Sequence, residues 1–113
     1  MGILDETGRL LGRITLSGIV RGALLSGNIG YWVAEHSNGQ GHATNAVTAT
    51  VRLAFEDLGL HRVQAETLVH NEPSHRVLAK AGFTRYGLAP AYLRIAGAWQ
   101  DHVMYQRLND SVE

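Results

Sequence analysis

The chain has 113 residues, a length that predicts one domain with a single core. Ten basic residues balance ten acidic ones, so the charge favours neither a nucleic-acid nor a membrane partner. The absence of cysteine excludes disulfides, thiolate nucleophiles and cysteine-ligated metals. No apolar run approaches the roughly 18 residues of a membrane span and no leader pattern precedes the first expected strand, so we expect a cytoplasmic protein.

The N-terminal third of the chain is predicted to form neighbouring antiparallel strands. Residues 3–12 read as a strand, a tight turn and the start of a second strand, so the chain begins inside a hairpin. Residues 9–19 alternate loosely between apolar and polar side chains, and residues 27–34 form a further run rich in aromatic and β-branched residues.

The apolar period changes at Ala43, from about two residues to three or four. One face of a helix is then predicted to carry Ala43, Val47, Val51, Ala54, Phe55 and Leu58. Gly59 is a suitable C-terminal stop for this helix. The helix is therefore expected to pack on the sheet.

A second, shorter helix is predicted after a strand at residues 62–69. Asn71 can cap it, and Pro73 is tolerated in its first turn. Its buried side is expected to comprise Val77, Leu78 and Ala81.

Two last strands, at about residues 84–91 and 100–107, can pair through the loop around Gly97. The predicted order is β-β-β-α-β-α-β-β. There are no repeats, low-complexity tracts or linkers, so residues 1–113 are expected to be a single domain.

The segment from Tyr31 to Thr44 is an extended apolar run that breaks into a glycine-rich turn and then enters the first helix. Glycine lets the backbone turn tightly and approach a ligand, and the first N–H groups of a helix attract an anion. We therefore expect a phosphate-bearing ligand at Asn38, Gly39, Gln40, Gly41, His42, Ala43 and Thr44. An ordinary strand-to-helix connection fits the loop equally well, and Gly39-x-Gly41 also matches the start of a dinucleotide-binding fingerprint.

Motifs further along the chain narrow the choice of ligand. Asn71-Glu-Pro-Ser74, Ala81-Gly82-Phe83 and Gly41-His42-Ala43 resemble the Asn-x-x-Ser/Ala, Gly-Phe and Gln/Arg-x-x-Gly-x-Gly/Ala motifs of the GNAT acetyltransferases. Residues 92–102 resemble the Rim-type ribosomal-protein alanine N-acetyltransferases, and the likeness covers nearly the whole chain. It implies an α/β (α+β) fold with a mixed, mostly antiparallel sheet and helices packed on it. The family's opening strand and two helices are not found, so we expect a GNAT domain that is N-terminally truncated relative to the family.

The resemblance implies an acetyl-CoA-dependent N-acetyltransferase that acts by direct transfer to a primary amine. It favours a protein N-terminal amine as acceptor and leaves a small-molecule amine open. The backbone of Trp32, Val33 and Ala34 would pair with the pantetheine arm where two strands separate, and Asn71 would contact the same arm. Asn38 stands where the family prefers Gln or Arg, so phosphate binding is expected to depend mainly on backbone N–H groups.

The same resemblance implies roles in proton transfer for two side chains. Ser74 matches a position proposed as the acid that protonates the leaving thiolate, and Leu78 occupies the place where many relatives carry a tyrosine. Glu66 lies where related enzymes place a carboxylate base, with Glu35 and His36 as alternatives. A plain structural role is open for each: a helix-end serine and a strand glutamate. An α-amine with a pKa near 8 is already partly neutral at pH 7, so a base is not obligatory.

Further predictions concern two rival functions, a metal site and a homodimer. A non-catalytic coenzyme A-binding module is the main alternative. A dinucleotide-binding enzyme is disfavoured because seven residues, Glu35 to Gly41, intervene where it needs a tight turn, and His70-Asn71 rather than an acidic residue ends the next strand. The six histidines show no metal-ligand spacing, so no metal is expected. We expect a homodimer, because apolar surface would be exposed where the family's first elements pack.

Overall fold

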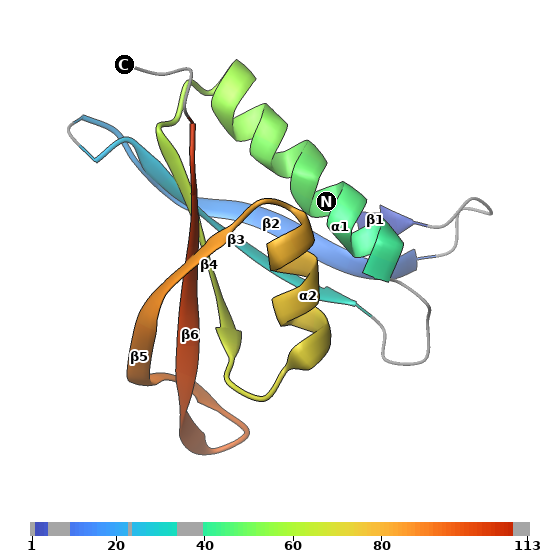
Figure 1. The fold of residues 1–113 in the computed structure, drawn as a ribbon, viewed down its shortest axis with the longest axis vertical. Helices are drawn as coiled ribbons and strands as arrows, with labels where there is room; N and C mark the ends of the chain where they lie inside the picture. Colours follow the sequence, from blue (N-terminus) through green and yellow to red (C-terminus); the bar gives the residue numbers. More distant parts are fainter. Residues whose placement is uncertain (1, 5–9, 23, 34–39, 110–113) are drawn as a thin grey trace.

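A computed structural model describes residues 2–4, 10–22, 24–33 and 40–109 of the chain (Figure 1). The elements are β1 (Gly2–Leu4), β2 (Leu10–Val20), β3 (Ser26–Val33), α1 (Gln40–Arg52), η1 (Leu53–Asp57), β4 (Arg62–Leu68), α2 (Glu72–Lys80), β5 (Thr84–Ile95) and β6 (Ala98–Leu108). Apart from η1, which continues α1, this confirms the predicted order of strands and helices.

The strands form one mixed sheet in the order β1-β2-β3-β4-β6-β5. Only the pairing of β3 with β4 is parallel, while the other four pairs are antiparallel. The prediction of a mixed, mostly antiparallel sheet is therefore confirmed. α1 and α2 contact each other and lie on one face of this sheet (Figure 1).

The core lies between α1 and the sheet, where the predicted helix face is buried. Ala43, Val47, Val51 and Ala54 are each at most 2% exposed, whereas Phe55 and Leu58 are half-buried. Burial of this apolar stripe holds the helix on the sheet.

The end of the first helix differs from the prediction of a continuous α-helix to Leu58. Leu53–Asp57 form a π-helical turn, in which the N–H of Leu58 donates to the carbonyl of Leu53 at 3.2 Å. Gly59 follows with φ of +66°, a conformation that glycine adopts without strain, so its predicted role as the stop is confirmed.

The predicted alternation of β4 is confirmed up to the end of that strand. Val63, Ala65 and Thr67 are buried, but the strand ends at Leu68, and Val69 is 47% exposed. The predicted buried side of α2 is also confirmed, because Val77, Leu78 and Ala81 are at most 3% exposed.

β5 and β6 are longer than predicted and meet at a tight turn. Ala96 and Gly97 have φ of +53° and +80°, so the turn includes the predicted glycine. The pairing shifts between Arg85 and Gly87 and again between Ala89 and Leu93. Such irregularities break the two-residue alternation, which explains why the sequence pattern understated the length of β5.

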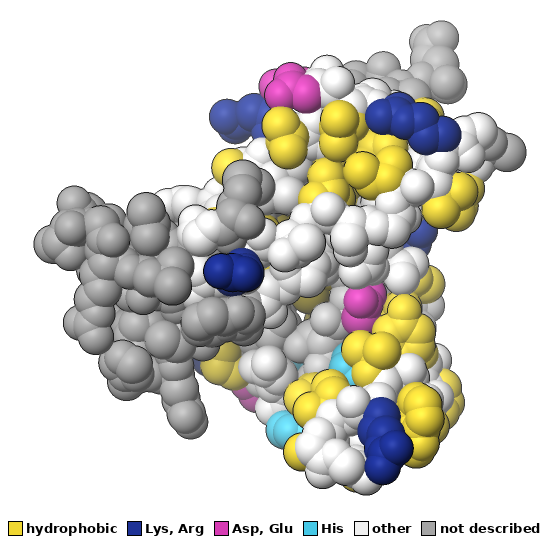
Figure 2. All heavy atoms as spheres, turned by 180° about the vertical axis from the view of Figure 1, so that it is seen from behind, with side chains coloured by type: hydrophobic (Ala, Val, Ile, Leu, Met, Phe, Trp, Pro, Cys, Tyr) yellow, Lys and Arg dark blue, Asp and Glu magenta, His cyan; other side chains and the backbone are white. Residues whose placement is uncertain are grey.

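Large hydrophobic side chains remain exposed near two ends of the sheet. Figure 2 shows them on the face behind the helices, near the β2–β3 end and over the β5–β6 hairpin. The exposed residues in these two places include Ile19, Val20, Leu24, Leu88, Tyr92, Leu93, Ile95 and Trp99.

Candidate functional site

The sheet opens between β3 and β4. Their parallel pairing joins Ser26, Gly27 and Asn28 to Arg62, Val63 and Gln64. Among the described residues it ends there, although β3 continues to Val33 and β4 to Leu68. Two parallel strands that separate leave backbone groups free to bind an extended ligand. The predicted separation of these strands is therefore confirmed.

On its other side, β3 remains paired as far as the opening extends. Trp32 and Val33 lie opposite Arg13 and Gly12 of β2. The backbone of β3 is thus held in place by β2 while its opposite edge faces the opening. Ala34, the third residue predicted to pair with a pantetheine arm, lies outside the described residues.

Of the predicted phosphate loop, the structure describes only the residues that lie in α1. α1 begins at Gln40, and no acidic residue occupies its first turn. The first N–H groups of an α-helix lack partners within the helix, and its dipole places positive potential there. His42 and Thr44 are half-buried and Ala43 is buried. Asn38 and Gly39, together with the alternative bases Glu35 and His36, lie outside the described residues.

Gly41 differs from the expected tight-turn glycine. It is the second residue of α1, and it is not among the described residues with positive φ. An added Cβ would meet no described protein atom within 4 Å. Gly41 thus contributes open space beside the helix start rather than an unusual backbone angle.

Asn71 caps α2, as predicted. Its Oδ1 accepts a hydrogen bond from the backbone N–H of Ser74 at 3.3 Å. Its backbone N–H donates to the carbonyl of Leu68 at 3.1 Å, which ties the cap to the end of β4. The start of α2 is therefore placed directly beside the opening.

The hydroxyl of Ser74 lies 2.7 Å from the hydroxyl of Tyr31 on β3. Tyr31 also lies beyond Asn28, the last residue of β3 that pairs with β4. The hydroxyl pair therefore joins the two sides of the opening. The sequence analysis missed Tyr31, since an aromatic residue in an apolar strand gives no signal beyond packing.

Burial is the main reason why the pKa of Tyr31 is raised above its ordinary value of 10.0. The bond to Ser74 opposes this shift, and the nearby Tyr105 adds to it. Tyr31 therefore stays protonated at neutral pH and keeps a proton to donate.

A second hydroxyl contact anchors the residue after Ser74. Nε2 of His75 lies 3.0 Å from the carbonyl of Val69, which only accepts, so Nε2 carries a proton. In the neutral ring Nδ1 then accepts from the hydroxyl of Tyr105, 2.6 Å away. This chain of contacts fixes the first turn of α2 against β6.

Glu66 lies on the sheet face away from α1 and α2, since its neighbours Ala65 and Thr67 are buried beneath the helices. Its Oε1 accepts a hydrogen bond from Nδ2 of Asn28 at 3.1 Å. Its Oε2 is buried and has no hydrogen-bond partner among the described residues. A buried carboxylate oxygen without a partner is costly, so this atom is a candidate acceptor for a ligand's N–H group.

An aromatic side chain adjoins this carboxylate. The pKa of Tyr92 is raised, first by burial and then by the charges of Glu66 and Tyr86. The ring of Tyr92 meets the ring of the buried His102 edge to face, with centroids 5.6 Å apart. Tyr92 and Asn28 were not predicted as site residues. The sequence could have indicated Asn28 as a polar residue in a strand.

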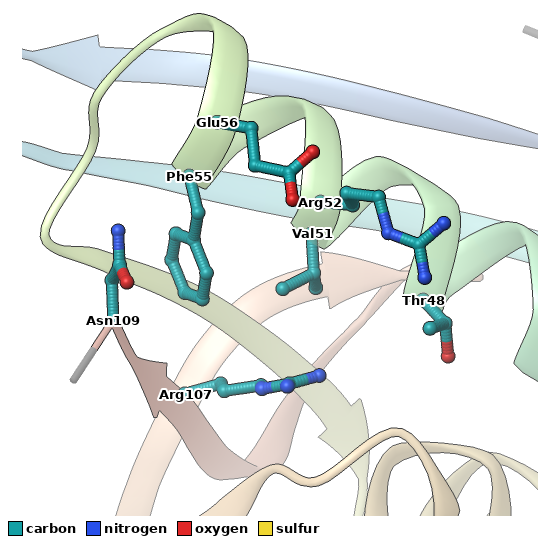
Figure 3. Close-up of a pocket in the computed structure, with 7 residues that line it drawn as sticks. All are labelled: Thr48, Val51, Arg52, Phe55, Glu56, Arg107 and Asn109. Carbon is teal, nitrogen blue, oxygen red and sulfur yellow. The ribbon is translucent and has the colours of Figure 1, made fainter. Parts of the chain in front are cut away.

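A pocket of about 300 Å³ lies elsewhere, between the end of the first helix and β6 (Figure 3). Phe55 and Val51 point from the helix toward Arg107. Arg107 pairs with Val63 at the start of β4, whereas the opening lies at the end of β4. This pocket is therefore separate from the candidate site.

No cluster of three His, Asp or Glu side chains within the described residues could hold a metal ion. No helix in the same residues is both long and apolar enough to cross a bilayer.

Known proteins resemble this chain in both sequence and fold. Residues 1–84 match the model of the acetyltransferase (GNAT) domain family. A probable N-acetyltransferase of Bacillus subtilis, YjcK, is 43% identical over 93% of this chain and 58% of its own length. The ribosomal protein uS5-alanine N-acetyltransferase of Escherichia coli is 34% identical over 91% of this chain and 54% of its own length. The chain thus spans little more than half of these relatives.

Solved structures agree with the sequence comparison. The ribosomal-protein-S5-alanine acetyltransferase of Vibrio fischeri superposes with a TM-score of 0.89 at 34% identity, covering 97% of this chain and 61% of that one. RimJ of Mycobacterium smegmatis, in complex with CoA-disulfide, has a TM-score of 0.86 at 38% identity, covering 94% of this chain and 51% of that one. The chain belongs to the GNAT acetyltransferase family.

Proposed function

We propose that this chain forms an acetyl-CoA-dependent N-acetyltransferase domain that transfers acetyl to a primary amine. The observation that carries the proposal is the placement of Ser74 and Glu66 on opposite faces of the sheet beside one opening. A thioester seated in the opening would then have an acid on the side of the helices and a base on the other side.

Coenzyme A fits the residues that surround the opening. The start of α1 offers N–H groups, no acidic side chain and open space at Gly41, which suits a pyrophosphate. The edge of Trp32 and Val33 that pairs with no described strand suits the amides of the pantetheine arm. We include Asn71 because its cap uses Oδ1, and Nδ2 has no hydrogen-bond partner among the described residues and could donate to a ligand. Bound there, acetyl-CoA supplies an activated acetyl group.

Ser74 and Glu66 would move the two protons of the reaction. Glu66 takes a proton from the amine nitrogen as that nitrogen bonds to the acetyl carbon. Ser74 gives its hydroxyl proton to sulfur as the carbon–sulfur bond breaks. Water then returns a proton to Ser74 and removes one from Glu66, so the net change moves one proton from nitrogen to sulfur.

We propose a protein N-terminal amine as the acceptor. The support is the likeness to the uS5-alanine N-acetyltransferase, together with the unpartnered Oε2 of Glu66, which can accept from an amine. A small-molecule amine is the alternative.

The expected homodimer, the cytoplasmic location and the single-domain organisation remain predictions. Sedimentation of the purified chain tests the dimer.

Release of free thiol from acetyl-CoA should be measured with three acceptors: a peptide with a free N-terminal alanine, the same peptide with a blocked N-terminus and an internal lysine, and spermidine. We expect turnover only with the first peptide. Turnover only with spermidine would show that the acceptor is a small-molecule amine and not a protein N-terminus. Tight binding of coenzyme A without turnover on any acceptor would favour the non-catalytic module.

Two variants test the residues within the same assay. Glu66→Gln and Ser74→Ala should each lower kcat by roughly ten- to a thousandfold, with little change in the KM for acetyl-CoA. Gln106→Glu places a carboxylate elsewhere on the same sheet face and serves as a control for charge. Wild-type rates in both site variants would reject their proposed roles.

A further inference from the structure

We propose that Tyr31 is a positioning residue whose hydroxyl holds Ser74 with its proton directed toward the leaving sulfur. This inference rests on the proposed function, in which Ser74 donates to sulfur. It adds a residue of β3 to a step that otherwise involves only α2.

The positions of the protons carry the argument. Two acceptors lie near the hydroxyl of Tyr31, the Oγ of Ser74 at 2.7 Å and the carbonyl of Ser74 at 3.3 Å. The shorter distance is typical of a good hydroxyl–hydroxyl bond, and the longer one is at the weak end of the range. Either hydroxyl can be the donor in this contact, and we assign that role to Tyr31, so that the proton of Ser74 points away from Tyr31.

The location of the pair decides where that proton points. Tyr31 lies on β3 beyond the last residue that pairs with β4, and Ser74 lies in the first turn of α2. A proton of Ser74 that points away from Tyr31 can therefore enter the opening, where a thioester sulfur would lie. Without Tyr31, the hydroxyl of Ser74 is free to rotate toward its own helix, as serine commonly does in a first turn.

Tyr31 is suited to hold this orientation. Burial favours its neutral form, so the hydroxyl keeps its proton at neutral and mildly alkaline pH. The ring packs against the core from β3, which holds the oxygen in place. In the proposed function Ser74 donates to sulfur, and Tyr31 sets the direction of that donation.

Tyr31→Phe removes the hydroxyl and keeps the ring. We expect kcat to fall about tenfold, the effect of losing one neutral hydrogen bond in the transition state, with the KM for acetyl-CoA within twofold. The double variant Tyr31→Phe/Ser74→Ala should be no slower than Ser74→Ala alone, because Tyr31 acts only through Ser74. The matched control, Tyr86→Phe, removes an exposed hydroxyl that contacts Gln64 and should leave kcat within twofold.

A second readout does not depend on turnover. Free coenzyme A should be bound, and the pKa of its thiol measured from the absorbance of the thiolate. A hydrogen bond from Ser74 to sulfur favours the thiolate, so Tyr31→Phe and Ser74→Ala should each raise that thiol pKa by up to about one unit, and Tyr86→Phe should not.

The outcomes separate the inference from the proposed function. If no amine is acetylated but both variants raise the thiol pKa, the proposed function fails and the positioning role stands. If the wild type is active but Tyr31→Phe matches it in kcat and thiol pKa, the positioning role fails alone. An equal loss in Tyr86→Phe would mean that the loss is not specific to the contact with Ser74, which also overturns the role. Failure to bind coenzyme A at all would overturn both.

Discussion

The side-chain amide of Asn28 donates to the carboxylate of Glu66 across 3.1 Å, beside the point where β3 and β4 separate. Asn28 is the last residue of β3 that pairs with β4, so this bond closes the narrow end of the opening. It also satisfies one oxygen of a carboxylate whose other oxygen is buried without a partner in the described part of the chain.

Asn28→Ala should therefore lower the free energy of unfolding by about 1 to 3 kcal/mol, because it leaves both oxygens of a half-buried carboxylate without a described partner. The midpoint of urea unfolding measures the loss, provided that the m-value stays constant. Asn45→Ala, at an exposed position of α1, is the control and should not destabilise the chain. Equal midpoints for the two variants would show that the bond contributes nothing to stability.

Gly41→Val should abolish the rise in thermal midpoint that acetyl-CoA causes. That rise corresponds to about 2.7 kcal/mol at a hundredfold excess over the dissociation constant. The added side chain meets no described protein atom within 4 Å, so the unliganded fold should survive while the space for a pyrophosphate is filled. Ala49→Val, at an exposed position later in α1, should keep the full shift. If acetyl-CoA still raised the thermal midpoint of Gly41→Val by the full amount, its phosphates would have to bind elsewhere.

Two substitutions at Asn71 separate its cap from its proposed contact with the pantetheine arm. Asn71→Ala should cost about 1 kcal/mol of stability, since Oδ1 no longer accepts from the N–H of Ser74. Asn71→Ser keeps a capping oxygen and should stay within about 0.5 kcal/mol of the wild type. Both variants lack the amide nitrogen, so both should bind coenzyme A more weakly in a calorimetric titration. Unchanged affinity in Asn71→Ser would limit Asn71 to the cap.

The raised pKa of Tyr31 predicts a pH dependence of stability. Tyrosine is neutral when protonated, and its folded pKa lies above the ordinary value of 10.0. The stabilisation is therefore complete below pH 10 and is lost as the pH rises through the folded pKa. Denaturant unfolding between pH 8 and 11 should show a steeper decline for the wild type than for Tyr31→Phe. Parallel curves would show that Tyr31 titrates as it does in the unfolded chain.

Sequence periodicity was enough to predict the order of the strands and helices, and the family resemblance predicted the mixed sheet. The buried stripe of α1, the alternation of Val63, Ala65 and Thr67, and the cap at Asn71 are all local patterns, which depend on residues a few positions apart. The π-helical turn at the end of α1 and the irregular pairing of β5 were not predicted. Both depend on contacts with other elements and leave no regular spacing in the sequence.

The candidate site was predicted in its parts, and only the tertiary structure shows how they meet. The family resemblance predicted Ser74 and Glu66 as site residues, but their partners Tyr31 and Asn28 lie 43 and 38 residues away along the chain. A strand's period shows which face a side chain occupies. Which residues it meets depends on where the pairing of β3 and β4 ends, and that end point is a property of the assembled sheet.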